Sequence, residues 1–261
     1  MRALLAVVLA LSMLLQGCLS GVVGAIDEVV SERRGVPGGL TLACLMDDAF
    51  TSMVVEIDHA PNHAPEASTV DLLLERLDEV CSKPNGITVE LQETSFEAID
   101  TWTADDVRRV ALDTRAAPPQ DGDVLRWHIL MPAGTYEDES VLGVAVNAAD
   151  IAIFGDSIDD SENILRRPSA EAIENSVAVH EIGHLLGLVN AVYVSPRDHE
   201  DKDHPHHSSN DASVMYWAVE SSSLGAIFSG TLPDAFDADD KADLADLQAR
   251  DLEATDQLWT P

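Results

Sequence analysis

The segment His180-Glu181-Ile182-Gly183-His184-Leu185-Leu186-Gly187 is the most informative stretch of this 261-residue sequence. In an α-helix four residues turn the chain by about 400°, so His180 and His184 lie on one face, one turn apart. Two imidazoles in this arrangement can both bind one zinc ion at about 2.0–2.1 Å. Glu181 is offset around the helix, where it can reach water beside the metal without taking a ligand position. We therefore predict a zinc site in which Glu181 is the general base.

The residues around this segment predict a long buried helix. Ser169 is a favourable N-cap, and the helix is expected to run to about Leu186. Its apolar residues, such as Val177 and Ile182, can pack against a sheet while the polar residues face a cleft. Gly187 can end the helix, because glycine adopts positive φ angles without strain.

Strand and helix patterns alternate upstream of this helix. Runs of β-branched or alternating residues predict strands at residues 53–57, 87–91, 124–131, 141–146 and 151–154. Apolar residues at helical spacing predict helices at residues 68–81, 103–114 and 236–252, the second of them capped by Thr103. This order of elements predicts a single α/β (α+β) domain.

The motif at His180 resembles that of the metzincin metallopeptidases, H-E-x-x-H-x-x-G-x-x-H followed by a Met-turn. The match runs from His180 to Gly187 and then breaks, since Asn190 stands at the third-ligand position. A neutral amide oxygen competes poorly with imidazole for zinc. The resemblance implies a zincin-like catalytic domain, in which a mixed twisted sheet packs on the active-site helix and a Met-turn and a C-terminal helix follow.

The loop after this helix is long and rich in histidine. About 25 residues separate the helix from the next recognisable motif, which exceeds an ordinary connection and suggests a functional or metal-organised loop. Four histidines lie within residues 199–207. The same composition would also suit a solvated polar loop or a second, independent metal site.

A more specific similarity singles out one of these histidines. In archaemetzincins the third histidine is followed by Cys, four residues, Cys, one residue and the Met-turn methionine. His207 and Met215 have the same spacing here, with Ser208 and Ser213 at the two cysteine positions. The resemblance implies that residues 189–206 are an insertion and that His207 is the third zinc ligand. The alternatives, in order of preference, are His204, His199 and Asn190.

Residues 213–216, Ser-Val-Met-Tyr, resemble a Met-turn. The resemblance implies that Met215 forms an apolar floor below the metal. Some metzincins place an oxyanion-stabilising tyrosine two residues after this methionine. Trp217 occupies that position here and Tyr216 comes one residue early, so that role is not carried over to Tyr216.

Other polar residues are interpreted as structural. His59, His63 and His128 lie on or near strand ends and are expected to be hydrogen-bonded surface groups. The aspartates of residues 237–243 lack the glycine and terminal glutamate of a calcium loop. We therefore expect them to form a solvated face of the last helix.

The N-terminus has the features of an export signal. An apolar run at residues 3–15 is too short to span a bilayer, but it suits a signal peptide. Leu15-Gln16-Gly17-Cys18 resembles a lipobox, which implies cleavage after residue 17 and lipidation of Cys18; an ordinary signal peptide is the alternative. The resulting division is a lipoprotein signal peptide at 1–17, a lipidated cysteine and linker at 18–39, and the catalytic domain at 40–261.

Charge and cysteine content restrict the partners and the compartment. Fifteen basic and 47 acidic side chains give a net charge of −32, so a phosphate backbone would be repelled and nucleic-acid binding is excluded. Besides Cys18, only Cys44 and Cys81 remain. Outside the cytoplasm these two can form a disulfide, and two buried free thiols are the alternative.

These features predict an extracytoplasmic, lipid-anchored zinc endopeptidase, expected to be a monomer, that hydrolyses peptide or protein substrates. The ligand types would also accept manganese or iron. The competing interpretation is a catalytically silent metal-binding lipoprotein, and an enzyme that hydrolyses a non-peptide amide is a second alternative. The number of protein ligands separates the two, since three ligands with an open position favour an enzyme and four favour a binding role.

Overall fold

A computed structural model describes residues 35–161, 168–222 and 231–260. The expected signal peptide, Cys18 and most of the expected linker lie outside the described residues. Within them, no helix is long and apolar enough to cross a membrane.

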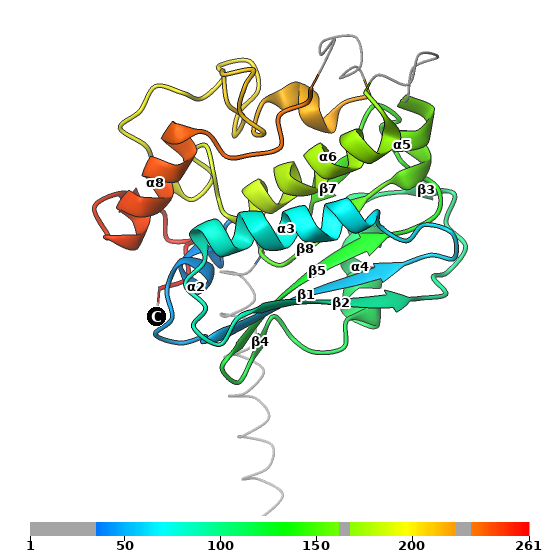
Figure 1. Cartoon of the computed structure of the whole chain (residues 1–261), viewed down its shortest axis with the longest axis horizontal. Helices are drawn as coiled ribbons and strands as arrows, with labels where there is room; N and C mark the ends of the chain where they lie inside the picture. Colours follow the sequence, from blue (N-terminus) through cyan, green and yellow to red (C-terminus); the bar gives the residue numbers. More distant parts are fainter. Residues whose placement is uncertain (1–34, 162–167, 223–230, 261) are drawn as a thin grey trace, which may run out of the picture.

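The core of the fold is a mixed, mostly parallel sheet with strand order β2-β1-β5-β8-β7 (Figure 1). The neighbours among β2, β1, β5 and β8 are parallel, whereas β7 runs antiparallel to β8 and β4 runs antiparallel to β5. The strands are β1 (Ser52–His59), β2 (Ile87–Glu93), β4 (Gln120–Asp121), β5 (Val124–Met131), β7 (Gly143–Ala145) and β8 (Asp150–Ile153). All five predicted strands are confirmed; the strand at 124–131 has the predicted bounds, and the other four differ at one or both ends.

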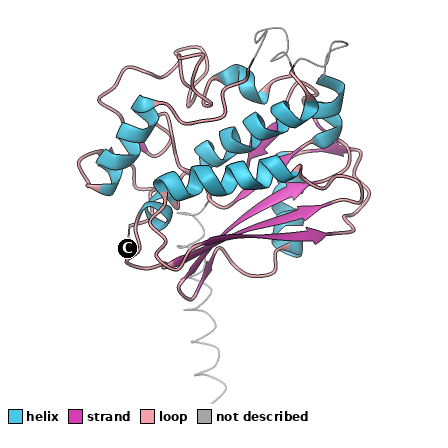
Figure 2. Cartoon of the chain, viewed as in Figure 1, coloured by secondary structure: helices cyan, strands magenta, loops and turns pink. Residues whose placement is uncertain are grey.

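Helices cover both faces of this sheet. Figure 2 shows two long helices side by side on one face, and a shorter helix packs on the other. The helices are α2 (Thr41–Leu45), α3 (Ala67–Val80), α4 (Ala104–Thr114), α5 (Gly155–Ser161), α6 (Ala170–Leu185) and α8 (Ala238–Gln248), with a 3₁₀ helix η1 (Trp217–Glu220). Short strand pairs join β3 (Thr101–Trp102) to β6 (Thr135–Tyr136) and β9 (Tyr193–Val194) to β10 (Glu253–Ala254).

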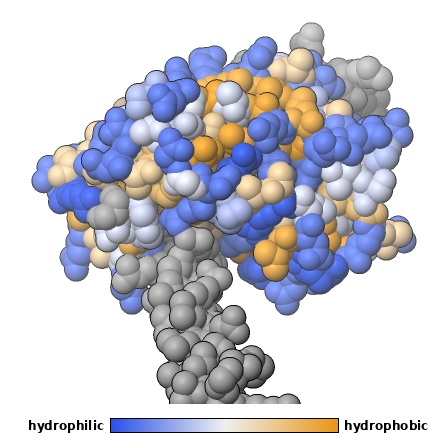
Figure 3. Space-filling view, turned by 90° about the horizontal axis from the view of Figure 1, so that it is seen from below, coloured by the Kyte–Doolittle hydropathy of each residue, from blue (hydrophilic) through white to orange (hydrophobic). Residues whose placement is uncertain are grey.

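Alternation along the strands explains the two layers. Ile129 and Ile151 point into the large core under α3 and α6, whereas their neighbours Leu130 and Ala152 point into a smaller core under α4. The sheet is therefore buried on both sides, as expected for mostly parallel strands. Figure 3 shows one face of the surface, which is mainly hydrophilic, in keeping with the acidic composition.

The last described part of the expected linker is packed into the domain. Gly38 has φ +85°, and a Cβ there would overlap the Cα of Gly187 at the end of α6. The backbone N–H of Trp259 also donates to the Gly39 carbonyl, at 2.8 Å. The folded unit therefore begins before residue 40, because this backbone fills the space beside the turn after α6.

Cys44 on α2 and Cys81 after α3 form a disulfide. The sequence left this open, since the pairing depends on how two helices approach each other, and the two cysteines lie 37 residues apart. The bond fastens the small N-terminal helix to the end of α3.

Replacing both cysteines by alanine should lower the free energy of unfolding. Releasing a 37-residue loop raises the entropy of the unfolded chain, which is worth about 4 kcal/mol. Urea unfolding of C44A/C81A beside the oxidised wild type measures the loss. The reduced wild type is the control and should resemble the double variant; equal stability of the oxidised and reduced proteins would contradict the disulfide.

Candidate metal centre

The helix that carries the motif, α6, is buried almost throughout. Its N-cap is Ser169, whose hydroxyl accepts from the Ala172 N–H at 3.2 Å, as predicted. The helix ends at Leu185, and Gly187 follows with φ +65°. His180 and Glu181 of this helix are fully buried under the chain segments that surround it.

Three histidines converge at the C-terminal end of α6. The Nε2 atoms of His180 and His184 are 3.1 Å apart. The His207 ring stacks on the His180 ring with centroids 5.2 Å apart, and it lies edge-on to His184 at 5.0 Å. One ligand atom from each histidine, and one from Glu220, lie within 4.8 Å of one another.

The surroundings of the imidazoles orient their lone pairs toward this common point. The Nδ1 of His180 lies 2.6 Å from the Val214 carbonyl oxygen, and the Nδ1 of His207 lies 3.1 Å from that of Pro205. A carbonyl oxygen only accepts, so each Nδ1 donates its proton there, and in the neutral imidazole Nε2 is then the nitrogen with the lone pair. Burial, and then the proximity of His180 and His207, lower the pKa of His184 well below its usual value. The donor set therefore fits a divalent transition-metal ion.

The other histidines and Asn190 are engaged elsewhere. The side-chain amide of Asn190 donates to Glu200 at 2.8 Å. His199 lies 3.0 Å from Asp243, and the His204 ring stacks on Trp217 with centroids 4.3 Å apart. Among the residues considered as third ligand, His207 is the one that the structure brings to the pair.

Backbone pairing places His207 there. The loop at residues 189–206, called the insertion loop below, folds back on itself, since the Asp201 N–H donates to the His207 carbonyl at 2.7 Å. The Ser208 N–H then donates to the Met215 carbonyl, also at 2.7 Å. These bonds fix the segment after the insertion against the segment that contains Met215. The residue that follows the loop thus reaches the end of α6.

Glu181 presents a buried carboxylate beside the sheet edge. Among the described residues, neither of its carboxylate oxygens has a partner with full hydrogen-bond geometry, although the backbone N–H of Ala145 is close enough to lower the pKa of Glu181 slightly. A Cβ at Gly143 of β7 would overlap the Glu181 carboxylate, so glycine at that position leaves room for it. Burial, and then the negative charge of Glu220, raise the pKa of Glu181 well above its usual value. Such a carboxyl group has the increased proton affinity that a general base requires.

Glu220, at the end of η1, is a site residue that the sequence did not reveal. Its carboxylate oxygens lie 3.2 Å from Nε2 of His207 and 3.6 Å from Nε2 of His180. Although burial alone would raise the pKa of Glu220, its contacts with His180 and His207 lower it. The carboxylate is therefore a fourth donor at the same point, and the one that carries a negative charge.

Pairing with the strand edge holds Glu220 in place. The Leu142 N–H donates to the Glu220 carbonyl at 2.8 Å, and the Ser222 N–H donates to the Ser140 carbonyl at 2.7 Å. A lone glutamate five residues after Met215 forms no recognisable pattern. Only its long-range pairing with residues 140–142 could have indicated it.

Met215 is buried directly beside α6. A Cβ at Gly183 would overlap the Met215 sulfur, so the glycine of the motif permits this close approach. The residue before Met215 supplies the carbonyl that accepts from His180. Helix and methionine segment are thereby held together behind the histidine cluster.

Two predictions about other polar residues are wrong. His128 is buried rather than a surface group, because β5 is a central strand, and it pairs with Asp58 at 3.0 Å. Asp240 and Asp243 of α8 are fully buried rather than solvated, because the insertion loop covers that face of the helix. Burial, and then the charge of Asp237, raise the pKa of Asp240 to about 6.

A pocket of about 360 Å³ opens beside the histidine cluster. Val144 and Ala145 of β7 line one side, and His184, His207 and Glu220 line another. Because β7 is an edge strand of the sheet, the pocket borders a strand edge that an extended peptide could approach.

The chain matches no family model and no curated protein. Among solved structures it is similar to archaemetzincin from Archaeoglobus fulgidus, determined as a complex with malonate. The identity is 19%, the match covers 74% of this chain and 99% of that chain, and the TM-score is 0.40. A likeness this distant does not establish membership of that family.

Proposed function

We propose that this chain is a zinc-dependent endopeptidase with a zincin-like catalytic domain. The observation that carries the proposal is the convergence of His180, His184 and His207. The buried carboxylate of Glu181 comes from the same helix and feels the charge of Glu220, which belongs to the same cluster. When bound, zinc supplies the Lewis acidity that acidifies water and polarises a carbonyl group. Met215 is the methionine of the Met-turn in this proposal.

The chain's own residues supply binding and proton transfer. His180, His184 and His207 would hold the metal. Glu181 accepts a proton from the attacking water and delivers it to the nitrogen of the leaving amine. Its burial keeps bulk water away from the carboxylate. The pocket along β7 is the expected position of an extended peptide.

A second candidate function is metal binding without catalysis, and Glu220 favours it. Four protein donors can fill a tetrahedral zinc site, which leaves no position for water. The side chain of Glu220 is 29% exposed, so it borders the pocket rather than the core. In the endopeptidase proposal, the three imidazoles would hold the metal, and Glu220 would border the place where the substrate binds without being a ligand.

Replacing Glu220 by glutamine distinguishes these functions. For an endopeptidase, E220Q should hydrolyse peptides at least as fast as the wild type, with zinc affinity reduced about tenfold or less, since three imidazoles remain. For a closed binding site, neither protein hydrolyses peptides and E220Q binds zinc much more weakly. Zinc titration and cleavage of quenched fluorescent peptides measure both quantities. Glu139 is an exposed glutamate, and Glu139→Gln is the matched control, which should change neither quantity.

We also propose that the mature chain is exported and anchored by lipid at Cys18, with a peptide or protein as its substrate. The Cys44–Cys81 disulfide supports an oxidising compartment, where such bonds persist. The large negative charge supports a solvated surface without nucleic-acid partners.

A further inference from the structure

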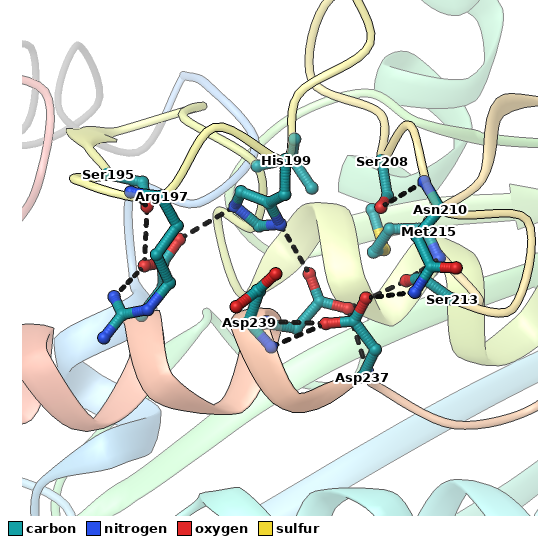
Figure 4. Close-up of polar contacts among 12 residues, drawn as sticks. Ser195, Arg197, His199, Ser208, Asn210, Ser213, Met215, Asp237 and Asp239 are labelled. Carbon is teal, nitrogen blue, oxygen red and sulfur yellow. Dashed lines mark hydrogen bonds and ion pairs between the residues drawn. The ribbon is translucent and has the colours of Figure 1, made fainter.

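A second group of ligand-type side chains lies between the insertion loop and α8. His199 comes from the loop, Asp237 is the N-cap of α8, and Asp240 stands in its first turn. Figure 4 shows His199 directed from the loop toward the helix end that carries Asp237. One ligand atom from each of these three residues lies within 4.8 Å of the others.

Two buried atoms in this group have no hydrogen-bond partner among the described residues. They are the Nδ1 of His199 and the Oδ1 of Asp240. Their side chains are 4% and 0% exposed, so bulk water does not solvate them. The two atoms are 3.8 Å apart, which is too long for a hydrogen bond but suits two ligands of one ion. Unpartnered buried polar atoms are rare, and two that face each other indicate a missing partner.

The remaining polar atoms of the group are already engaged. His199 Nε2 lies 3.0 Å from Asp243, whose carboxylate accepts its proton and leaves the Nδ1 lone pair facing Asp240. Metal-binding histidines commonly donate their second N–H to a carboxylate in this way. The Oδ2 of Asp240 accepts from the Ser213 hydroxyl at 2.9 Å, so Oδ1 is the oxygen left for an ion.

A comparable buried cluster in the sheet differs in one respect. His128 and Asp150 also face each other at 3.8 Å, but the Arg115 guanidinium pairs with Asp150 at 2.9 Å. A cation is therefore already present there. Next to Asp240 the described residues place no lysine or arginine within ion-pair distance.

We propose that His199, Asp237 and Asp240 form a second site for a divalent transition-metal ion such as zinc. One imidazole and two carboxylates suit zinc or manganese better than calcium, which prefers six or more oxygen ligands. The ion would join the insertion loop to α8. Through Ser213, whose hydroxyl accepts from the Met215 N–H, it would also stabilise the segment behind the first metal centre. The proposal does not depend on peptide hydrolysis.

Zinc stoichiometry tests the site in the purified protein. In H184A/H207A, which lacks the first centre, we expect one equivalent of zinc to remain. Adding D240N should weaken binding of that equivalent by at least ~10-fold, because the near-isosteric amide keeps the Ser213 contact but loses the charge. Adding D239N, an exposed aspartate on the same turn, should leave it unchanged. No zinc in H184A/H207A, or binding that D240N leaves unaltered, would overturn the proposal.

The ¹⁵N NMR shifts of the His199 ring provide a second measurement. It uses the wild-type protein, so it does not depend on whether a variant folds. Contact with Asp243 raises the pKa of His199, so the competing arrangement is an imidazolium held between two carboxylates. Zinc should shift the Nδ1 resonance of His199 and leave Nε2 protonated. A protonated Nδ1 that zinc at saturation does not alter would establish the ion pair and refute the site.

Discussion

Glu181→Gln should abolish peptide hydrolysis while the protein still binds zinc. The carboxylate is the only group in the proposed mechanism that moves a proton, and general-base catalysis contributes about 10²–10⁴-fold. We expect kcat to fall about 10³-fold. Zinc stoichiometry should stay at the wild-type value, because Glu181 is not among the four converging donors. Cleavage of quenched fluorescent peptides and metal analysis of the purified variant measure the two results.

Glu174→Gln is the matched control for this variant. Glu174 lies on the same helix, is also largely buried, and accepts from the Thr69 hydroxyl at 2.7 Å, away from the histidines. Burial raises the pKa of Glu174, so a neutral amide suits its surroundings. E174Q should keep near-normal activity. Full activity of E181Q would reject the general base, and equal losses in the two variants would indicate a fold defect.

His207→Ala should remove both zinc binding and hydrolysis. The binding free energy of a four-ligand zinc site, about 10–16 kcal/mol, corresponds to roughly 3 kcal/mol for each ligand. Losing one imidazole should therefore weaken zinc binding by at least ~100-fold. Competition with a chromophoric chelator measures the affinity, and peptide cleavage measures the activity.

The control for this variant is His204→Ala, from the same loop. His204 stacks on Trp217 and its side chain is 40% exposed, so alanine there should leave zinc affinity within a few-fold of the wild type. A larger loss in H204A than in H207A would show that the loop adopts a different path in the metal-bound protein. In that case the third ligand would have to be reassigned.

Local sequence patterns predicted most of the helices and strands, and they predicted two of the four residues that converge at the candidate site. The helix from Ser169, the turn at Gly187 and the facing pair His180 and His184 follow from 3.6-residue spacing and from capping chemistry. The five main strands follow from β-branched runs in the same way. These features depend on neighbours within a few residues, so the amino-acid order specifies them directly.

The rest required contacts between distant segments. The sequence ranked His207 above His204 and His199 by analogy, but only the folded loop shows which imidazole reaches α6. Glu220 had no pattern at all, since its position depends on backbone pairing with residues 140–142.

The buried aspartates show the same division between local and tertiary information. Asp240 and Asp243 are charged residues on a helix, and their sequence spacing alone suggests exposure. The insertion loop covers them and supplies His199 and Arg197 as partners. By itself the sequence determined the elements and the first two ligands, because each depends on short-range backbone geometry. The tertiary structure alone decided which loop side chains complete the site, because that choice depends on how segments tens of residues apart pack together.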